Sequence, residues 1–431
     1  MTRKRLNLKS EFVKNVATVM TGTALSQIVA LAITPILTRS YSPEDFGFLV
    51  VYMSILTITG TLSTGKFERA ILLVTEKSTI VKIVFLSSVI SILVSLSLFL
   101  FLLGLKGFLV SALDIENQFY NWLYTLPILI IIYSAYTVFN VILNYQKRFK
   151  QLATAKVIKT ISSIVISLSC IFFLKDARGL VLGEFSGYLV ACIFVVSSNG
   201  TFLDFSLNTR KNSLMVAKRF KDFPLFNIPS DFMNMTSNQM PVFFLTNYLG
   251  PGIAGLYSLM KRVLDAPVNL FSTSILEVFR QKASEQYLER GECKVLFIRT
   301  AKNLVAIAVV PFTILFVFAP QLFAFIFGEE WYKAGEYARI FSVFYFFKFI
   351  SSPLTYMFFI AEKQKMNFFI HLYIFCSSLF ILNLPRLITL NDKQMLWAYC
   401  FNFVIVYLFY FLISYKLSSG TWGGNSEKNK Y

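Results

Sequence analysis

The chain has 431 residues, of which 56% are apolar, 17% aromatic and only 15% charged. Soluble domains carry about a quarter charged residues, so these proportions exclude an ordinary water-soluble protein. Apolar runs such as 80–103, 123–143 and 157–174 are long enough to cross a bilayer core of roughly 30 Å as helices. The sequence therefore predicts a protein that crosses a membrane many times.

Splitting the chain at its charge clusters gives about twelve apolar spans. In chain order they cover residues 14–37, 46–65, 80–103, 121–143, 157–174, 179–198, 224–248, 253–279, 303–319, 340–361, 367–384 and 394–415. The connections between them are short, so we expect no catalytic domain outside the membrane. We predict an all-α integral membrane protein with an N-terminal six-helix lobe (1–198), an inter-lobe linker (199–223), a C-terminal six-helix lobe (224–415) and a tail (416–431).

Basic residues concentrate on one side of the predicted membrane. The formal net charge is +18, with 41 Lys and Arg residues. The connections on the opposite side hold only Arg39, Lys106, Lys175, Arg178, Lys333, Arg339, Arg386 and Lys393. By the positive-inside rule, both termini, the linker and the 280–302 loop face the cytoplasm. The expected location of these basic residues at the cytoplasmic membrane surface explains the positive net charge without a nucleic-acid partner.

A short pattern occurs twice in the chain, 208 residues apart. Leu37-Thr38 followed by Pro43 and Gly47 recurs as Leu245-Thr246 followed by Pro251 and Gly255. Both copies lie at the outer end of the first span of a six-span half. An even number of spans keeps the halves parallel, an architecture typical of transporters, with the substrate site expected between the lobes.

The 253–279 span carries the strongest candidates for a functional site, because a charge inside a bilayer is costly. Its polar residues recur at intervals of three or four: Ser258, Lys261, Arg262, Asp265, Asn269 and Ser272. Lys261 and Asp265 are four residues apart and are expected to pair. Arg262 is then the unneutralised cation and the leading anion ligand.

Three further spans carry polar faces, which predict a wet cavity. These faces comprise Thr18, Gly22, Ser26 and Gln27; Asn227, Asp231, Asn234 and Asn238; and Tyr345, Lys348, Ser352 and Tyr356. Lys66 and Arg69 are expected at the inner mouth. Amide and tyrosine side chains suit sugar hydroxyls, but the same groups also suit plain hydrogen bonding between helices, so both interpretations stay open.

No motif for catalysis, metal binding or a cofactor is found. The five cysteines show no paired spacing, and His371, the single histidine, is expected to be a packing residue or a weak proton site rather than a metal ligand. The sequence contains no glycine-rich phosphate loop and no nucleophile elbow. We therefore expect a transporter without cofactor or metal rather than an enzyme.

Several segments together resemble a known family. They are 37–47 (Leu-Thr-Arg-Ser-Tyr-Ser-Pro-Glu-Asp-Phe-Gly), 67–71 (Phe-Glu-Arg-Ala-Ile), 255–258 (Gly-Leu-Tyr-Ser) and 327–331 (Phe-Gly-Glu-Glu-Trp). In order and spacing they resemble the Wzx-type polysaccharide flippases of the multidrug, oligosaccharidyl-lipid and polysaccharide exporter superfamily. The resemblance implies alternating access between two six-helix lobes.

The resemblance also implies the substrate, undecaprenyl-pyrophosphate-linked oligosaccharide, and its transfer across the bacterial inner membrane for O-antigen, capsule or related polysaccharides. Other polysaccharide assembly proteins are implied as partners. With this substrate, the expected ligands of the pyrophosphate and sugars are Arg262, Lys348, Arg69, Lys66, Asn234, Asn238, Tyr345 and Asn269. The expected ion-coupling residues are Asp231, Asp265 and Lys261.

Three alternatives stay open to different degrees. A cation-coupled drug antiporter of the same superfamily needs membrane carboxylates, which Asp231 and Asp265 would supply. A lipid II flippase typically has fourteen spans and several arginines in its first lobe, whereas this chain has about twelve expected spans and few arginines there. A polysaccharide polymerase or ligase usually needs a large outer loop, whereas the longest outer connections here are 104–120 and 320–339.

Overall fold

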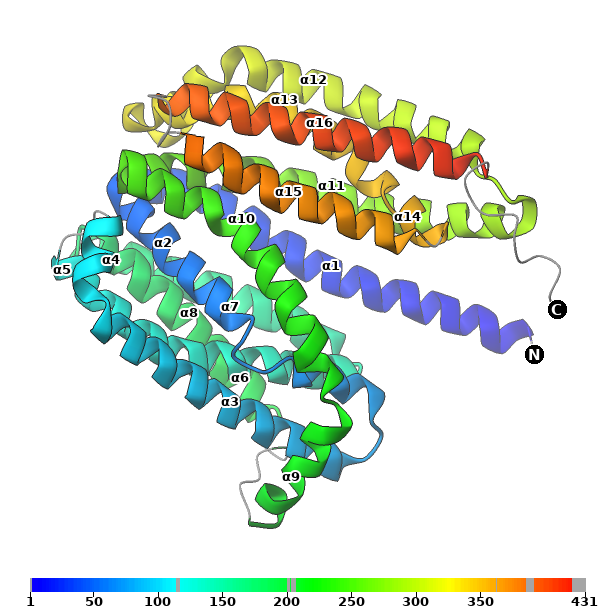
Figure 1. Cartoon of the computed structure of the whole chain (residues 1–431), viewed down its shortest axis with the longest axis horizontal. Helices are drawn as coiled ribbons and strands as arrows, with labels where there is room; N and C mark the ends of the chain where they lie inside the picture. The colour runs from blue at the N-terminus through cyan, green and yellow to red at the C-terminus, as the bar shows by residue number, and fades with distance from the viewer. Residues whose placement is uncertain are drawn as a thin grey trace. The chain divides into compact units, whose positions relative to one another are not determined.

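The computed structural model describes residues 2–113, 117–199, 202, 207–361, 363–384 and 391–420, and within these ranges every regular element is a helix. By contacts the chain divides into two compact units, Met1–Gly255 and Leu256–Tyr431. Figure 1 labels the helices of both units. The predicted all-α fold class is confirmed.

Nine helices in the described part of the chain are long and apolar enough to cross a membrane. They are Met20–Thr38, Lys77–Gly104, Asn121–Tyr145, Phe149–Cys170, Ala177–Ser197, Lys294–Phe327, Glu329–Ile360, Lys365–Asn383 and Asp392–Ser418. The three other expected spans fall on the helices α2 (Pro43–Gly60), α10 (Ile228–Leu249) and α11 (Pro251–Arg290). Their polar and charged residues lower their hydropathy, as expected for helices that do not face lipid all round.

The first unit is built on pairs of packed helices. α1 (Thr2–Thr38) packs along α7 (Phe149–Cys170), which packs against α8 (Ala177–Ser197), and α3 (Lys77–Gly104) packs on α6 (Leu126–Tyr145). α2 contacts α6, α8 and α10. The shorter elements are η1 (Phe67–Leu73), α4 (Lys106–Leu113), α5 (Asn117–Tyr120), η2 (Asn121–Thr125), α9 (Leu207–Arg219) and η4 (Phe223–Asn227).

The start of α2 shows why the chain turns where it does. Ser42 accepts a hydrogen bond from the Asp45 backbone N–H at 3.2 Å, and the Asp45 carboxylate accepts one from the Ser42 backbone N–H at 2.9 Å. Pro43 occupies the first helical position, where its missing N–H is not needed. This capping box fixes α2 directly after α1.

The second unit consists of the rest of α11 with α12 (Lys294–Phe327), η5 (Glu329–Trp331), α13 (Tyr332–Leu354), α14 (Met357–Ile360), α15 (Gln364–Asn383) and α16 (Asp392–Ser418). α13 packs against both α12 and α16, and α15 packs on α16. Its interior is aromatic: Trp331 is fully buried, and Phe344 contacts the rings of Phe403 and Tyr407.

The division by contacts falls after Gly255 because α10 packs on α2 of the first unit. The expected lobes, 1–198 and 224–415, refer to membrane topology and stay a prediction. The expected span 46–65 is longer than its helix, because α2 ends at Gly60 and the chain turns before η1.

Candidate functional site

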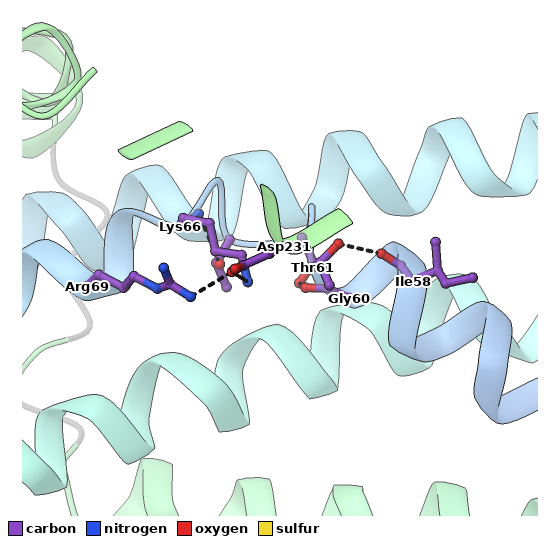
Figure 2. Close-up of polar contacts among 8 residues, drawn as sticks. Ile58, Gly60, Thr61, Lys66, Arg69 and Asp231 are labelled. Atoms are coloured by element: carbon purple, nitrogen blue, oxygen red, sulfur yellow. Dashed lines mark hydrogen bonds and ion pairs between the residues drawn. The ribbon is translucent and has the colours of Figure 1, made fainter. Parts of the chain in front are cut away.

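Two cationic side chains of the first unit converge on one carboxylate oxygen. Lys66 Nζ lies 2.9 Å and Arg69 Nη2 2.6 Å from Oδ2 of Asp231, and Figure 2 shows both side chains directed at it. Lys66 is almost buried, with 13% of its side chain exposed, whereas Arg69 is 45% exposed. We call these three residues the Asp231 clamp. Its formal net charge is +1.

The turn after α2 positions the two cations. Thr61 closes the helix by donating from Oγ1 to the carbonyl of Ile58 at 2.7 Å (Figure 2). Gly65 and Lys66 both have a left-handed backbone, with φ of 62° and 60°, and Lys66 leads directly into η1, which carries Arg69. A non-glycine residue in this conformation is uncommon and is held by its surroundings.

The carboxylate of the clamp comes from a distant part of the chain, 162 residues after Arg69. Asp231 lies in the first turn of α10, directly after the π-helical turn η4. Asn234 and Asn238 follow at helical spacing, and Asn238 Nδ2 donates to both the carbonyl and the side chain of Asn234, at 2.9 and 3.2 Å. Both asparagines are exposed. α10 therefore presents a carboxylate and two amides along one stretch of helix.

In the second unit, Lys348 on α13 forms an ion pair with Asp265 on α11, with Nζ and Oδ1 2.7 Å apart. The same ammonium group lies over the rings of Tyr345 at 4.7 Å and Phe344 at 5.7 Å. About a fifth of each charged side chain is exposed, 20% for Lys348 and 23% for Asp265. Tyr345 is buried and also interacts with Asp265.

This pair adds a second cation to the one expected beside Asp265. The ion pair joins Asp265 to Lys348 of another helix, while Lys261 stands near enough to feel the charges of both. Arg262, expected to be the unneutralised cation, also has an interaction within the described part of the chain. Arg262 and Asn269 are exposed on α11, seven residues apart and thus on one face of the helix.

A cavity of about 290 Å³ lies among α1, α6, α7 and α8 of the first unit. Its lining is mostly polar and aromatic: Thr23, Ser26, Gln27, Ala30, Tyr136, Lys156, Lys159, Thr160 and Tyr188. Ser26 and Gln27 were expected on a cavity face. Lys156 and Lys159 were not among the predicted site residues. The available signal was Lys159 inside one apolar run with Glu184 inside the next.

The remaining candidate, His371, is exposed on α15. Its ring lies 6.3 Å from that of Tyr410 in an edge-on arrangement. The packing role expected from the sequence stays a prediction.

The sequence profile of a family described as "Polysaccharide biosynthesis protein" matches residues 36–336. The chain belongs to this family. The match covers the Asp231 clamp, α10, α11 and α12, and the resemblance found in the sequence is confirmed at the level of family and fold. No curated protein matches the chain in sequence.

Solved transporters of one superfamily share the fold. One is an inward-facing multidrug resistance MATE family transporter of the MOP superfamily. It is 14% identical in sequence, the alignment covers 93% of this chain and 95% of the transporter, and the TM-score is 0.67. The lipid II flippase MurJ in an inward closed conformation is 14% identical, with 92% and 87% covered and a TM-score of 0.69.

A third similar structure is a MOP superfamily transporter from Pyrococcus furiosus, described as having a binding pocket of reverse polarity that suggests a different function. It is 16% identical, with 94% of this chain and 96% of its own covered and a TM-score of 0.62. At these identities the likeness concerns the fold. The chain is thus a multi-pass membrane protein with the fold of these transporters.

Proposed function

We propose that the protein is a flippase for lipid-linked oligosaccharides, moving an undecaprenyl-pyrophosphate-linked unit outward by alternating access. Membership of the polysaccharide biosynthesis family and the fold shared with a lipid II flippase support this function. The observation that carries the proposal is the Asp231 clamp, because two cations around one oxygen form a ready anion site.

Asp231 occupies the position that a phosphate oxygen would take. A pyrophosphate can receive the Lys66 ammonium as a point charge and the Arg69 guanidinium through its planar fork. Exchange of one anion for another keeps both cations paired, and the displaced Asp231 carboxylate is neutralised by taking up a proton or a cation, since an unpaired charge away from water carries a large penalty. The substrate headgroup thus competes with Asp231 for the clamp.

The other expected ligands are assigned by their chemistry. Arg262 and Asn269 on the exposed face of α11 offer a further cation and an amide, and Lys348 offers a cation beside Tyr345. On α10, Asn234 and Asn238 offer amides to sugar hydroxyls. A coupling ion would act at the step that releases Asp231 or Asp265 from its cation. Lys261 lies close to the second of these pairs.

A drug antiporter is the second candidate, since the MATE fold is shared. A cationic drug needs a carboxylate to bind. Within the described residues, Asp231 and Asp265 each have a cationic partner, so a cationic drug would have to displace a lysine or arginine. The charge balance of the clamp therefore favours an anionic substrate.

We place the protein in the bacterial inner membrane with both termini in the cytoplasm, beside the other proteins that assemble O-antigen, capsule or exopolysaccharide. The distribution of Lys and Arg supports this topology. Reporters fused after Asn208 and after Gly328 test it, because the first should report the cytoplasm and the second the outside. Equal activity of an outside-only reporter at both positions would contradict the topology.

Transport of a fluorescent lipid-linked oligosaccharide in proteoliposomes tests the function. Loss of two charge-assisted contacts predicts that the double variant Lys66→Gln/Arg69→Gln slows transport about tenfold or more. The matched control is Lys218→Gln/Arg219→Gln, which removes two exposed cations of α9. Wild-type transport by the clamp variant, or transport of a cationic dye but not of the oligosaccharide, would reject the proposal.

A further inference from the structure

The cavity of the first unit shares no lining residue with the Asp231 clamp. α1 contributes Thr23, Ser26, Gln27 and Ala30, α6 contributes Tyr136, α7 contributes Lys156, Lys159 and Thr160, and α8 contributes Tyr188. Its volume of about 290 Å³ lies at the lower end of ligand pockets, which hold roughly 300–1,000 Å³. A single ring fits this space better than a whole oligosaccharide unit.

The two lysines of the cavity differ in their charge balance. Lys159 is neutralised by Glu184, with Nζ and Oε2 2.5 Å apart, and its ammonium group stands 4.6 Å from the centre of the Tyr188 ring. Ser163 donates to the other oxygen of Glu184 at 3.0 Å. Lys156 instead donates to the neutral Thr23 hydroxyl at 2.9 Å, and no described carboxylate pairs with it. The cavity therefore carries one uncompensated positive charge.

The cavity also contains an acceptor that lacks a donor. Gln27 Oε1 is buried and has no hydrogen-bond partner among the described residues. An unsatisfied buried acceptor is unfavourable, so a ligand that brings an O–H group to this oxygen gains free energy. Tyr136 and Tyr188, whose rings meet edge-on at 5.9 Å, add an apolar surface with polar tips.

We propose that this cavity binds one acidic sugar residue, a pyranose ring that carries a carboxylate. The carboxylate pairs with Lys156, a ring hydroxyl donates to Gln27 Oε1, and the ring lies against the tyrosines. A neutral sugar leaves Lys156 uncompensated, and an inorganic anion has no ring. The inference deepens the proposed function, on which it rests, because it names the class of sugar in the transported unit.

Binding of free monosaccharides to the full chain in nanodiscs tests this site without requiring transport. Methyl glucuronide should bind about tenfold more tightly than methyl glucoside, because only the former offers a charge-assisted bond to Lys156. Lys156→Gln should abolish this preference, whereas Lys156→Arg should retain it. Gln27→Leu should weaken binding of both sugars. The matched control, Lys218→Gln, should behave as the wild type.

Three results would overturn the inference. They are equal binding of the two sugars by the wild type, an unchanged preference in Lys156→Gln, and competition by inorganic phosphate at the same concentration as glucuronide. Gel filtration of each variant establishes that it is folded, and Lys156→Arg reports on the charge if Lys156→Gln is unstable. Because the readout is binding, these results are independent of the clamp variants, whose failure appears in transport.

Discussion

Gly47 on α2 lies directly against the backbone carbonyl of Pro251, the first residue of α11. A Cβ built on Gly47 would stand 1.9 Å from that oxygen, and a Cβ built on Gly255 would stand 1.9 Å from the carbonyl oxygen of Pro43. The repeated prolines and glycines of the sequence thus meet one another in a reciprocal contact. Small residues allow such close approach of helix backbones in membranes.

Substitution of these glycines tests the contact. Because a Cβ would collide with backbone rather than with a flexible side chain, Gly47→Ala and Gly255→Ala should each destabilise the fold by about 1–3 kcal/mol. Thermal unfolding in detergent measures the loss. Gly107→Ala on α4 is the control, since nothing lies within 4 Å of its added Cβ. Identical unfolding midpoints for all three variants would contradict the prediction, because α2 and α11 would then accommodate the added methyl group without loss of stability.

The Lys348–Asp265 pair predicts strongly non-additive mutations. Asp265→Asn leaves the partly buried Lys348 without its carboxylate and should destabilise by about 2 kcal/mol or more. Lys348→Gln should cost less, because Lys261 still stands near Asp265. The double variant should recover much of this loss, and a double-mutant cycle of detergent unfolding gives the coupling free energy. Simple addition of the two single losses would contradict the pairing.

The same pair shows what sequence reasoning reaches and what it does not. Periodicity and charge placed Asp265 and Lys348 on polar faces of two spans, and both residues lie on helices there. The partner could not be predicted, because the ion pair joins residues 83 positions apart, and hydrophobic periodicity does not fix how two helices are rotated against each other. Sequence distance alone therefore pointed to Lys261, which does lie near Asp265, and missed Lys348.

The first unit gives a parallel case. Lys66, Arg69 and Asp231 were each predicted as functional, but as separate ligands and coupling groups. In the structure, Lys66 and Arg69 both contact the same oxygen atom of Asp231. The helices themselves were largely predictable, since every expected span overlaps one, although 46–65 runs past the end of α2 at Gly60 and 340–361 includes the turn between α13 and α14. The turn at Gly65 and Lys66 was not, because a left-handed lysine is set by its surroundings rather than by local preference.

A titration prediction concerns Asp176, which precedes α8 and caps it by accepting from the Arg178 backbone N–H at 2.9 Å. Burial alone would raise the pKa of Asp176, but the hydrogen bonds and charge of Arg178 outweigh it and hold the pKa below its usual 3.8. A lowered pKa in the folded state adds stability above pH 3.8, and this stability is lost as the pH falls through the folded value.

Asp176→Asn keeps the cap but removes the charge. It should lower stability near neutral pH and flatten the acid loss of stability below about pH 4. Thermal unfolding between pH 3 and pH 7 measures both effects. Asp222→Asn, which changes an exposed carboxylate, serves as the control. An unchanged acid slope in Asp176→Asn would place the titrating group elsewhere.

Membrane potential should drive the proposed transport directly. An inside-negative potential favours outward movement of a pyrophosphate of about two negative charges by roughly 2.3 kcal/mol per charge, or about 4.6 kcal/mol in all, at 100 mV. Lys66 directly precedes the short helix η1 of the first unit and Arg69 lies in it, so both cations stay with the protein while the headgroup leaves. In proteoliposomes with a potassium diffusion potential and no other ion gradient, transport should therefore quicken as the donor side becomes negative. Asp231→Asn should keep this voltage response, because the potential acts on the charge of the headgroup, and coupling of an ion through Asp231 would only add to it. If voltage has no effect, while a pH or sodium gradient accelerates the wild type and not Asp231→Asn, the driving force passes through Asp231 instead.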